Sequence, residues 1–430
     1  MEMQPSQKTF RSYLFFWSGQ LVSLLGSSVA QFVIIWWITL ETGSALYLSV
    51  AAVLGLAPMI MLSPFAGVLI DRWSRKILIG FVDCVQALAT VVLIVLFSLG
   101  SVSIWYVFAM LTLRGICQAF HSPAVMAVIP SMVPKEKLSR MNGLRYLFIG
   151  AISLIGPVVA ALLLDIWRIS QILWIDVATF VVALTPLLLV KIPSVRTKLD
   201  TSSLRQDFAD GFRYVKSKRG LLPLMVLAMM LNFLLTPLGT LLPYYVKFDH
   251  LGEVTDLAFV EAALQGGILA GGVLMSIIKG FKRKMGVTML SLYMVFGGYA
   301  LAALTPTSLF LFMAMALLAA AFFIPIVNVL FATIIQTAVP LKMQGRVNSV
   351  DMGLSSAAQP LGMILSGLII EFTRASTLFL SCAAVGALTL TASWFFTDMR
   401  HVEKMEDSLI ESKQAKPHDV SSLEETDTPP

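Results

Sequence analysis

The segment GVLIDRWSRK, Gly67–Lys76, is a cluster of charged residues between two long apolar stretches. One stretch covers residues 45–70 and the other covers residues 77–98. Each reaches about 20 residues, the length that an α-helix needs to cross the hydrocarbon core of a bilayer. The segment is therefore predicted to be a short polar loop that joins two transmembrane helices.

The composition of the whole chain also indicates a membrane protein. Of its 430 residues, 57% are hydrophobic and 13% are charged, and the mean hydropathy is +0.83. A water-soluble core could not bury so much apolar surface. The apolar stretches lack the alternation of barrel strands, whereas a helix satisfies its own backbone hydrogen bonds in lipid. We therefore expect an all-α membrane protein.

Charges and turn residues divide the chain into twelve predicted spans. The spans lie near residues 12–38, 45–70, 77–98, 103–129, 141–164, 170–190, 221–246, 257–279, 286–304, 308–334, 346–370 and 376–397. The predicted domains are an N-terminal six-helix half (1–190), a cytoplasmic linker (191–220), a C-terminal six-helix half (221–397) and a disordered cytoplasmic tail (398–430). The tail is acidic and rich in Ser, so it has little apolar surface to bury.

The positions of Lys and Arg predict the orientation of these spans. Nearly all of them lie in the loops on the side of the two termini, and the opposite side carries Arg168, Lys247 and Arg374. The positive-inside rule therefore places both termini in the cytoplasm, with the chain in the inner (cytoplasmic) membrane. The net charge of +6 resides in short loops rather than on one soluble face, so nucleic acid is not an expected partner.

Two short echoes indicate an internal repeat. GVLID at Gly67–Asp71 matches GVLMS at Gly272–Ser276 with an offset of 205 residues. PKEKLSRMN at Pro134–Asn142 matches PLKMQGRVN at Pro340–Asn348 with an offset of 206 residues. Because each half holds an even number of spans, both halves start on the same side of the membrane. The fold is therefore predicted to be a parallel pseudo-repeat about an axis along the membrane normal.

The charged loop resembles the signature of the major facilitator superfamily. Ser74 replaces a usual glycine, and the second-half copy has Ser276 in place of the acidic residue. The positions that match are Gly67, Asp71, Arg72, Arg75 and Lys76. The resemblance implies the major facilitator fold and a gating role for this loop, in which a helix-ending carboxylate and nearby cations lock and release helix ends. The alternative is that these charges only set topology and solvate the loop.

Four further segments look like the macrolide-efflux branch of the drug:proton antiporters. They are WSGQLVSLLGSSVAQ (Trp17–Gln31), FHSP (Phe120–Pro123), the surroundings of Asp176, and GRVNS (Gly345–Ser349). This resemblance implies a proton-coupled exporter of macrolides or other amphipathic drugs that works by rocker-switch alternating access, with protons and membrane lipid as its other partners. Lysophospholipid and siderophore transporters share much of the pattern and form the alternative.

Charged residues inside the spans are candidates for proton coupling. Arg114 lies near the middle of the fourth span, where a charge needs a partner, and it resembles the buried arginine of proton-coupled antiporters. A structural ion pair is its alternative role. Asp83, Asp176 and Glu261 are candidate proton carriers, because burial and a nearby cation shift a carboxylate pKa in opposite directions. For Asp83, and for Asp351, pairing with a nearby arginine is the simpler explanation.

Uncharged polar and aromatic residues inside the spans are candidates for lining a substrate cavity. These candidates are Gln31, Phe32, Phe120, Asn232, Asn328 and Gln359. Their amides could bind a substrate by hydrogen bonds, and their rings could form an apolar wall. Hydrogen bonding between helices is the alternative for each amide.

Other classes of protein lack a site in this sequence. The three cysteines lie inside apolar segments, without metal-ligand spacing. No phosphate-binding GKS/T loop, zinc pattern or nucleophile elbow is present, so an ATP-driven pump or an enzyme is not expected. No cofactor or metal is expected, and the protein is predicted to act as a monomer. A passive channel and a membrane-embedded enzyme are minor alternatives.

Overall fold

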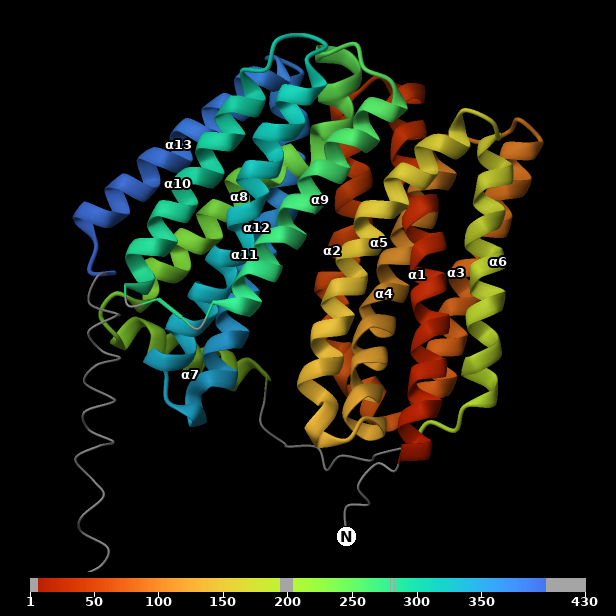
Figure 1. Ribbon diagram of the computed structural model, residues 1–430, viewed down its shortest axis with the longest axis horizontal. Helices are drawn as coiled ribbons and strands as arrows, with labels where there is room; N and C mark the ends of the chain where they lie inside the picture. The colour runs from red at the N-terminus through yellow and green to blue at the C-terminus, as the bar shows by residue number, and fades with distance from the viewer. Residues whose placement is uncertain (1–6, 194–203, 279, 282, 400–430) are drawn as a thin grey trace, which may run out of the picture.

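The computed structural model describes residues 7–193, 204–278, 280–281 and 283–399 (Figure 1). This part of the chain is helical throughout and contains no strand. The helices of the first half and the linker are α1 (Gln7–Thr42), α2 (Ala45–Arg72), α3 (Arg75–Ser98), α4 (Ile104–Met132), a 3₁₀ turn (Lys135–Lys137), α5 (Leu138–Leu164), α6 (Ile169–Leu189) and α7 (Leu204–Ser217). The helices of the second half are α8 (Leu221–Tyr244), a π-helical turn (Tyr245–Asp249), α9 (Val254–Ile277), α10 (Lys284–Ala303), α11 (Phe310–Ala338), α12 (Leu341–Ile370) and α13 (Ala375–Phe396).

Each predicted span corresponds to one long helix, which confirms the predicted fold class. Eleven helices of the described chain are long and apolar enough to cross a membrane. The remaining span is α4, which has 29 residues but carries Arg114, Gln118 and His121. These polar side chains lower its hydropathy. The helix can hold them because they face the interior of the bundle, where Arg114 is buried and Gln118 and His121 line a cavity.

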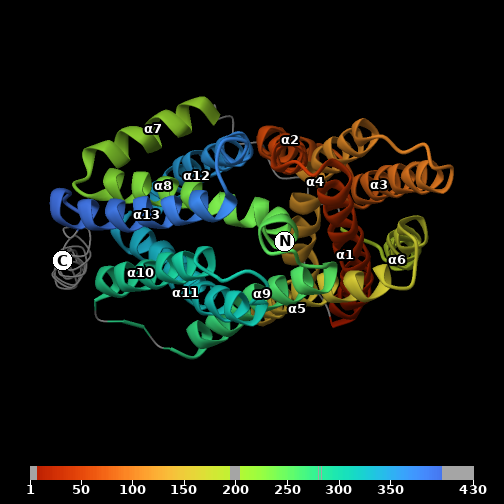
Figure 2. The same ribbon diagram turned by 90° about the horizontal axis from the view of Figure 1, so that it is seen from above.

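The helices form two bundles, α1–α6 and α8–α13, which lie side by side (Figures 1 and 2). The two bundles approach one another toward the upper end of Figure 1 and separate toward the end where α1 begins and α7 lies. Smaller contacts between them are made by α8 with α1 and α2, and the main ones by α2 with α12 and by α5 with α9. These equivalent pairs are what a two-fold pseudo-repeat produces.

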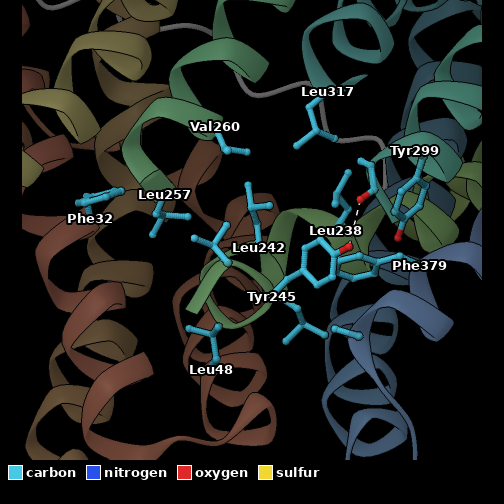
Figure 3. Packing of buried hydrophobic residues seen from close by; sticks show 14 of the residues in the cluster. Phe32, Leu48, Leu238, Leu242, Tyr245, Leu257, Val260, Tyr299, Leu317 and Phe379 are labelled. Carbon is cyan, nitrogen blue, oxygen red and sulfur yellow. Dashed lines mark hydrogen bonds between the residues drawn. The ribbon is translucent and has the colours of Figure 1, made fainter. Parts of the chain in front are cut away.

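A hydrophobic core cluster spans both halves (Figure 3). Phe32 and Leu48 come from the first half, and Leu242, Tyr245 and Leu257 come from the second. All five are at least 90% buried. The Tyr245 hydroxyl donates a hydrogen bond of 3.0 Å to a backbone carbonyl near the end of α10, so its polar atom is satisfied. Apolar burial on this scale stabilises the contact between the halves.

Close approach of α9 and α11 depends on glycine. A Cβ atom on Gly267 would overlap the carbonyl group of Leu318, and one on Gly271 would overlap that of Phe322. Because α9 presents only hydrogen atoms at these two positions, the two backbones pack directly against one another.

The linker contains a helix, α7, that packs against α12. Asp210 forms a 3.3 Å ion pair with Arg346 near the start of α12. On the same side, Val215 is fully buried in a cluster with Val347 and Val350. The helix is therefore attached to the second half. Residues 194–203 of the predicted linker and residues 400–430 of the predicted tail lie outside the described residues.

Candidate functional site

A cavity of about 640 Å³ lies inside the first half. Helices α1, α3, α4, α5 and α6 contribute to its lining, which is largely apolar. The charged and amide side chains that line it are Gln20, Asp83, Gln86, Gln118, His121, Arg145 and Asp176. Helical spacing explains this set, because residues three or four apart share one face of a helix. Asp83 and Gln86 on α3 are three residues apart, and so are Gln118 and His121 on α4.

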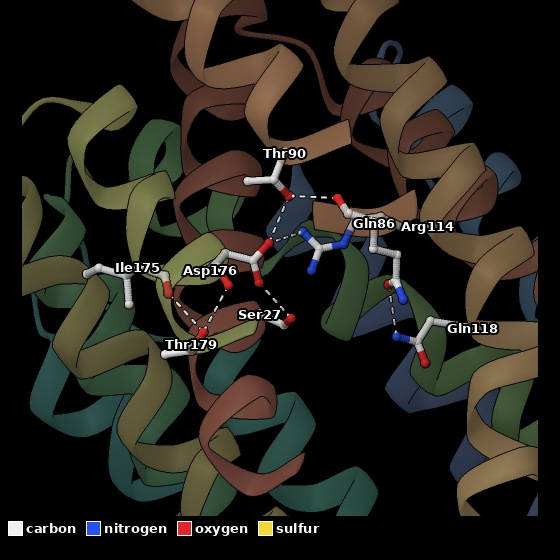
Figure 4. Close-up of polar contacts among 8 residues, drawn as sticks. All are labelled: Ser27, Gln86, Thr90, Arg114, Gln118, Ile175, Asp176 and Thr179. Carbon is white, nitrogen blue, oxygen red and sulfur yellow. Dashed lines mark hydrogen bonds and ion pairs between the residues drawn. The ribbon is translucent and has the colours of Figure 1, made fainter. Parts of the chain in front are cut away.

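Asp176 of α6 lies in the interior of this bundle and contacts three other helices (Figure 4). Its carboxylate lies 3.5 Å from the guanidinium group of Arg114 on α4. It accepts hydrogen bonds of 2.7 Å from the Ser27 hydroxyl on α1 and 2.8 Å from the Thr90 hydroxyl on α3. The Asp176 and Arg114 residues are only 6% and 8% exposed. One carboxylate therefore connects four helices, and Arg114 has the partner that its position required.

A second polar cluster lies on the wall of the same cavity. The Nε2 atom of His121 is 3.1 Å from Asp83 and 3.2 Å from the Gln20 amide oxygen. Beside it, Gln118 donates a 3.2 Å hydrogen bond to Gln86. The expectation that Asp83 pairs with an arginine is thus wrong, because α4 places His121 next to it. The seven-residue spacing of His121 from Arg114 on α4 is the sequence signal that both side chains face the same interior.

Arg145 of α5 also lines this cavity. Its guanidinium group contacts the Met126 sulfur and lies 5.0 Å from the Tyr146 ring centroid. Its buried Nε atom has no hydrogen-bond partner, and no carboxylate of the described chain lies within ion-pair distance. Arg145 is therefore a cation of the cavity wall without a matching anion.

The second half contains a smaller cavity of about 240 Å³ between α8, α10, α11 and α12. Its wall includes Asn232, Asn328 and Asp351, and most of its other residues are apolar. The Oδ1 atom of Asp351 is buried and has no hydrogen-bond partner among the described residues. The two predicted amide ligands Asn232 and Asn328 are thus brought together with a carboxylate that sequence reasoning assigned to an arginine.

The other predicted cavity residues line neither of these two cavities. Phe32 lies in the core cluster that spans both halves. Phe120 packs against a second hydrophobic cluster, which includes residues near the start of α1. Gln31 is exposed and Gln359 is half-buried. Glu261 is half-buried on α9, outside both cavities. The structure therefore does not group Glu261 with Asp83 and Asp176.

Comparison with known proteins identifies the fold. The family model of the Major Facilitator Superfamily matches residues 16–356. The chain belongs to this superfamily. It is therefore a membrane transporter of small molecules and not an enzyme.

Relatives and solved structures span most of this transporter. Macrolide efflux protein A of Streptococcus pyogenes is 31% identical over 83% of this chain and 88% of its own length. The staphyloferrin A transporter of Staphylococcus aureus is 25% identical over 62% of this chain and 67% of its own. The crystal structure of a bacterial homologue of the iron transporter ferroportin, in an inward-facing state, aligns with a TM-score of 0.69 at 16% identity, covering 89% of this chain and 98% of that one.

The charged loop of this transporter spans the end of α2 and the start of α3. Gly67, Asp71 and Arg72 lie in the last turns of α2, where the structure describes the backbone alone. Arg75 donates a 2.7 Å hydrogen bond to the Ala127 carbonyl on α4. Lys76 donates hydrogen bonds of 2.6 and 3.0 Å to two carbonyls at the C-terminal end of α6. The loop cations thus connect α3 to the ends of two other helices of the same half.

Proposed function

We propose that this transporter exports macrolides or other amphipathic drugs in exchange for protons. The observation that carries the proposal is the 31% identity to macrolide efflux protein A across 83% of the chain. The cavity of the first half supports it, since its volume of about 640 Å³ lies within the range of drug-sized ligand sites. A mainly apolar surface that also carries several polar and charged groups suits an amphipathic solute better than a sugar or an inorganic ion.

Transport would proceed by rocking of the two halves as a monomer. With the N-terminal side in the cytoplasm, as the loop charges indicate, the separated end in Figure 1 faces the cytoplasm. The outward-facing state then requires the α2–α12 and α5–α9 contacts to open. Arg75 and Lys76 keep the cytoplasmic ends of α3, α4 and α6 together, so that the first half can move as one body. With Asp71 and Arg72 they form the proposed gating loop.

Proton coupling would use Asp176 or Asp83 of the first half, or Glu261 of the second. Protonation of Asp176 would remove its negative charge and weaken the ion pair with Arg114, so that α4 and α6 could move relative to one another. Asp83 and His121, whose side chains line the cavity, form a second pair that can carry a proton from the cavity toward the interior. Glu261 lies on α9, a helix that contacts α5 of the first half, and is the third candidate.

Drug export is tested by expression in a bacterium that lacks its own efflux pumps. The wild-type protein should raise the inhibitory concentration of a macrolide, and Asp176→Asn should abolish the increase at equal membrane expression. Unchanged inhibitory concentrations across a broad panel of hydrophobic drugs would refute the proposed substrate class.

Proton exchange is tested with the purified protein in a weakly buffered solution. Addition of the macrolide should release protons, and the release should disappear in the variant that lacks the coupling carboxylate. Asp176→Asn, Asp83→Asn and Glu261→Gln are compared side by side. Full proton release by all three variants would contradict coupling through these residues.

A siderophore or lysophospholipid substrate is the second candidate. The similarity to the staphyloferrin A transporter supports it, and so does Arg145, a cavity cation without a carboxylate partner. Carboxylate or phosphate groups are the natural ligands of a guanidinium group. Uptake or export of a radiolabelled carboxylate siderophore that is lost in Arg145→Gln, without any effect on drug resistance, would favour this candidate.

A further inference from the structure

The internal repeat places two opposite charges at one equivalent position. The 206-residue offset that aligns Asn142 with Asn348 also aligns Arg145 with Asp351. Arg145 lies on α5 of the first half, and Asp351 lies on α12 of the second half. These two helices occupy the same place in their six-helix halves.

Both residues of this pair line the cavity of their own half. The Nε atom of Arg145 and the Oδ1 atom of Asp351 are each buried without a hydrogen-bond partner in the described chain. Since one half has a cation and the other an anion, the fold does not require a particular charge here. The sign of the charge at this position can therefore be set by the ligand that the cavity binds.

Both carboxylates that line the first cavity already have a basic partner. Asp176 lies 3.5 Å from Arg114, and Asp83 lies 3.1 Å from the His121 ring, which balances its charge only when the ring is protonated. Arg145 lies on the same wall and would repel a cation, so this cavity suits a cation less well than one whose carboxylate has no basic partner.

Asp351, the carboxylate that lines the second cavity, has no such partner among the described residues. The sequence favoured pairing of Asp351 with a nearby arginine, but Arg346, which lies five residues before it, pairs with Asp210 of α7 at 3.3 Å. Among the described residues that line the second cavity, Asp351 is the one ionisable side chain. A buried charge without a partner is costly, so an entering cation would be stabilised there.

We propose that Asp351 binds the ammonium group of an organic cation, with the amide oxygens of Asn232 and Asn328 as further acceptors. The cavity volume of about 240 Å³ lies below the range for drug-sized ligands, so it would hold a head group only. The apolar body of the ligand would lie outside it. The inference rests on the proposed function and narrows its substrate class to amphipathic amines.

Binding of two matched probes to the purified full-length protein tests the inference. The probes are erythromycin, whose tertiary amine is protonated at pH 7, and erythromycin N-oxide, which has the same skeleton but no net charge. Isothermal titration calorimetry should show that Asp351→Asn weakens erythromycin binding about 10- to 100-fold, as expected for loss of a charge-assisted contact. The affinity for the N-oxide should change less than about threefold, because its head group has no net positive charge and forms no charge-assisted contact with the carboxylate.

Two further variants control for folding and for nonspecific charge effects. Asp351→Glu keeps the negative charge and should retain the preference for erythromycin over the N-oxide. Asp165→Asn makes the same carboxylate-to-amide change at an exposed position and should bind as the wild type does.

The possible outcomes separate this inference from the proposed function. If Asp351→Asn keeps the wild-type preference for erythromycin, or loses both probes equally, the ammonium site is refuted. Drug resistance conferred by the wild type would still support the exporter in that case. A wild type that shows the charge-dependent binding but confers no resistance would support the site and refute the export function. A wild type that binds neither probe would overturn the site.

Discussion

Replacing Asp176 by Asn should destabilise the first half by about 3 to 5 kcal/mol. The change leaves Arg114 buried at 8% exposure without its counter-charge, and removing one partner of a buried ion pair costs that much. The hydrogen bonds from Ser27 and Thr90 weaken as well, because their acceptor is no longer charged. Most of the loss should therefore come from the stranded guanidinium group.

The double variant Arg114→Gln, Asp176→Asn separates that cause from a loss of packing. It removes both charges together, so its free energy of unfolding should lie above that of Asp176→Asn, by about 2 kcal/mol if the uncompensated charge dominates. Unfolding in mixed micelles with a denaturing detergent, followed by circular dichroism, measures these differences. Two results would refute the reasoning. One is a double variant whose loss of unfolding free energy equals the sum of the losses in Arg114→Gln and Asp176→Asn, and the other is a loss below about 1 kcal/mol in Asp176→Asn.

Three further predictions concern packing, the loop and pH. Gly271→Leu should reduce the yield of monodisperse protein in size-exclusion chromatography, because the new side chain would overlap the Phe322 carbonyl. Gly272→Leu is the control and should behave as the wild type does, because no atom lies within 4 Å of a Cβ at that position. Lys76→Ala should lower the free energy of unfolding by roughly 1 kcal/mol, since α6 loses a cation at its C-terminal carbonyls, and an unchanged denaturation curve would contradict this. Burial lowers the pKa of His250 below 6.5, so the unfolded chain binds a proton that the folded chain excludes. The melting temperature should therefore fall as the pH drops below 6.5, and His250→Phe should reduce this slope; an equal slope in both proteins would contradict the assignment.

The sequence predicted the helices well because the hydropathy of a span depends only on consecutive residues. A span needs only enough consecutive apolar residues, so all of the long helices, including α4 with its buried Arg114, could be located before their neighbours were known. Helix ends differed by several residues, as for α1, which extends over Gln7–Thr42 instead of 12–38. The helix α7 in the linker was not predicted, because its burial depends on the distant α12.

Partners of the polar residues were harder to predict, because they come from helices far apart in sequence. Asp83 was expected to meet an arginine and instead meets His121. Asp351 was expected to pair with a nearby arginine, whereas Arg346, five residues before it, contacts Asp210 of α7. Spacing on one helix shows which face a side chain occupies, but only packing shows which helix faces it.

By itself, the sequence determined a twelve-helix membrane chain with a parallel repeat and family membership, because apolar length, basic loops and short motifs are local properties. Only the tertiary structure decided which charges are compensated. Long-range helix packing places Arg114 against Asp176 and leaves Arg145 and Asp351 without partners of opposite charge. In an apolar interior that difference in compensation is worth several kcal/mol, so packing selects the residues available to bind a ligand.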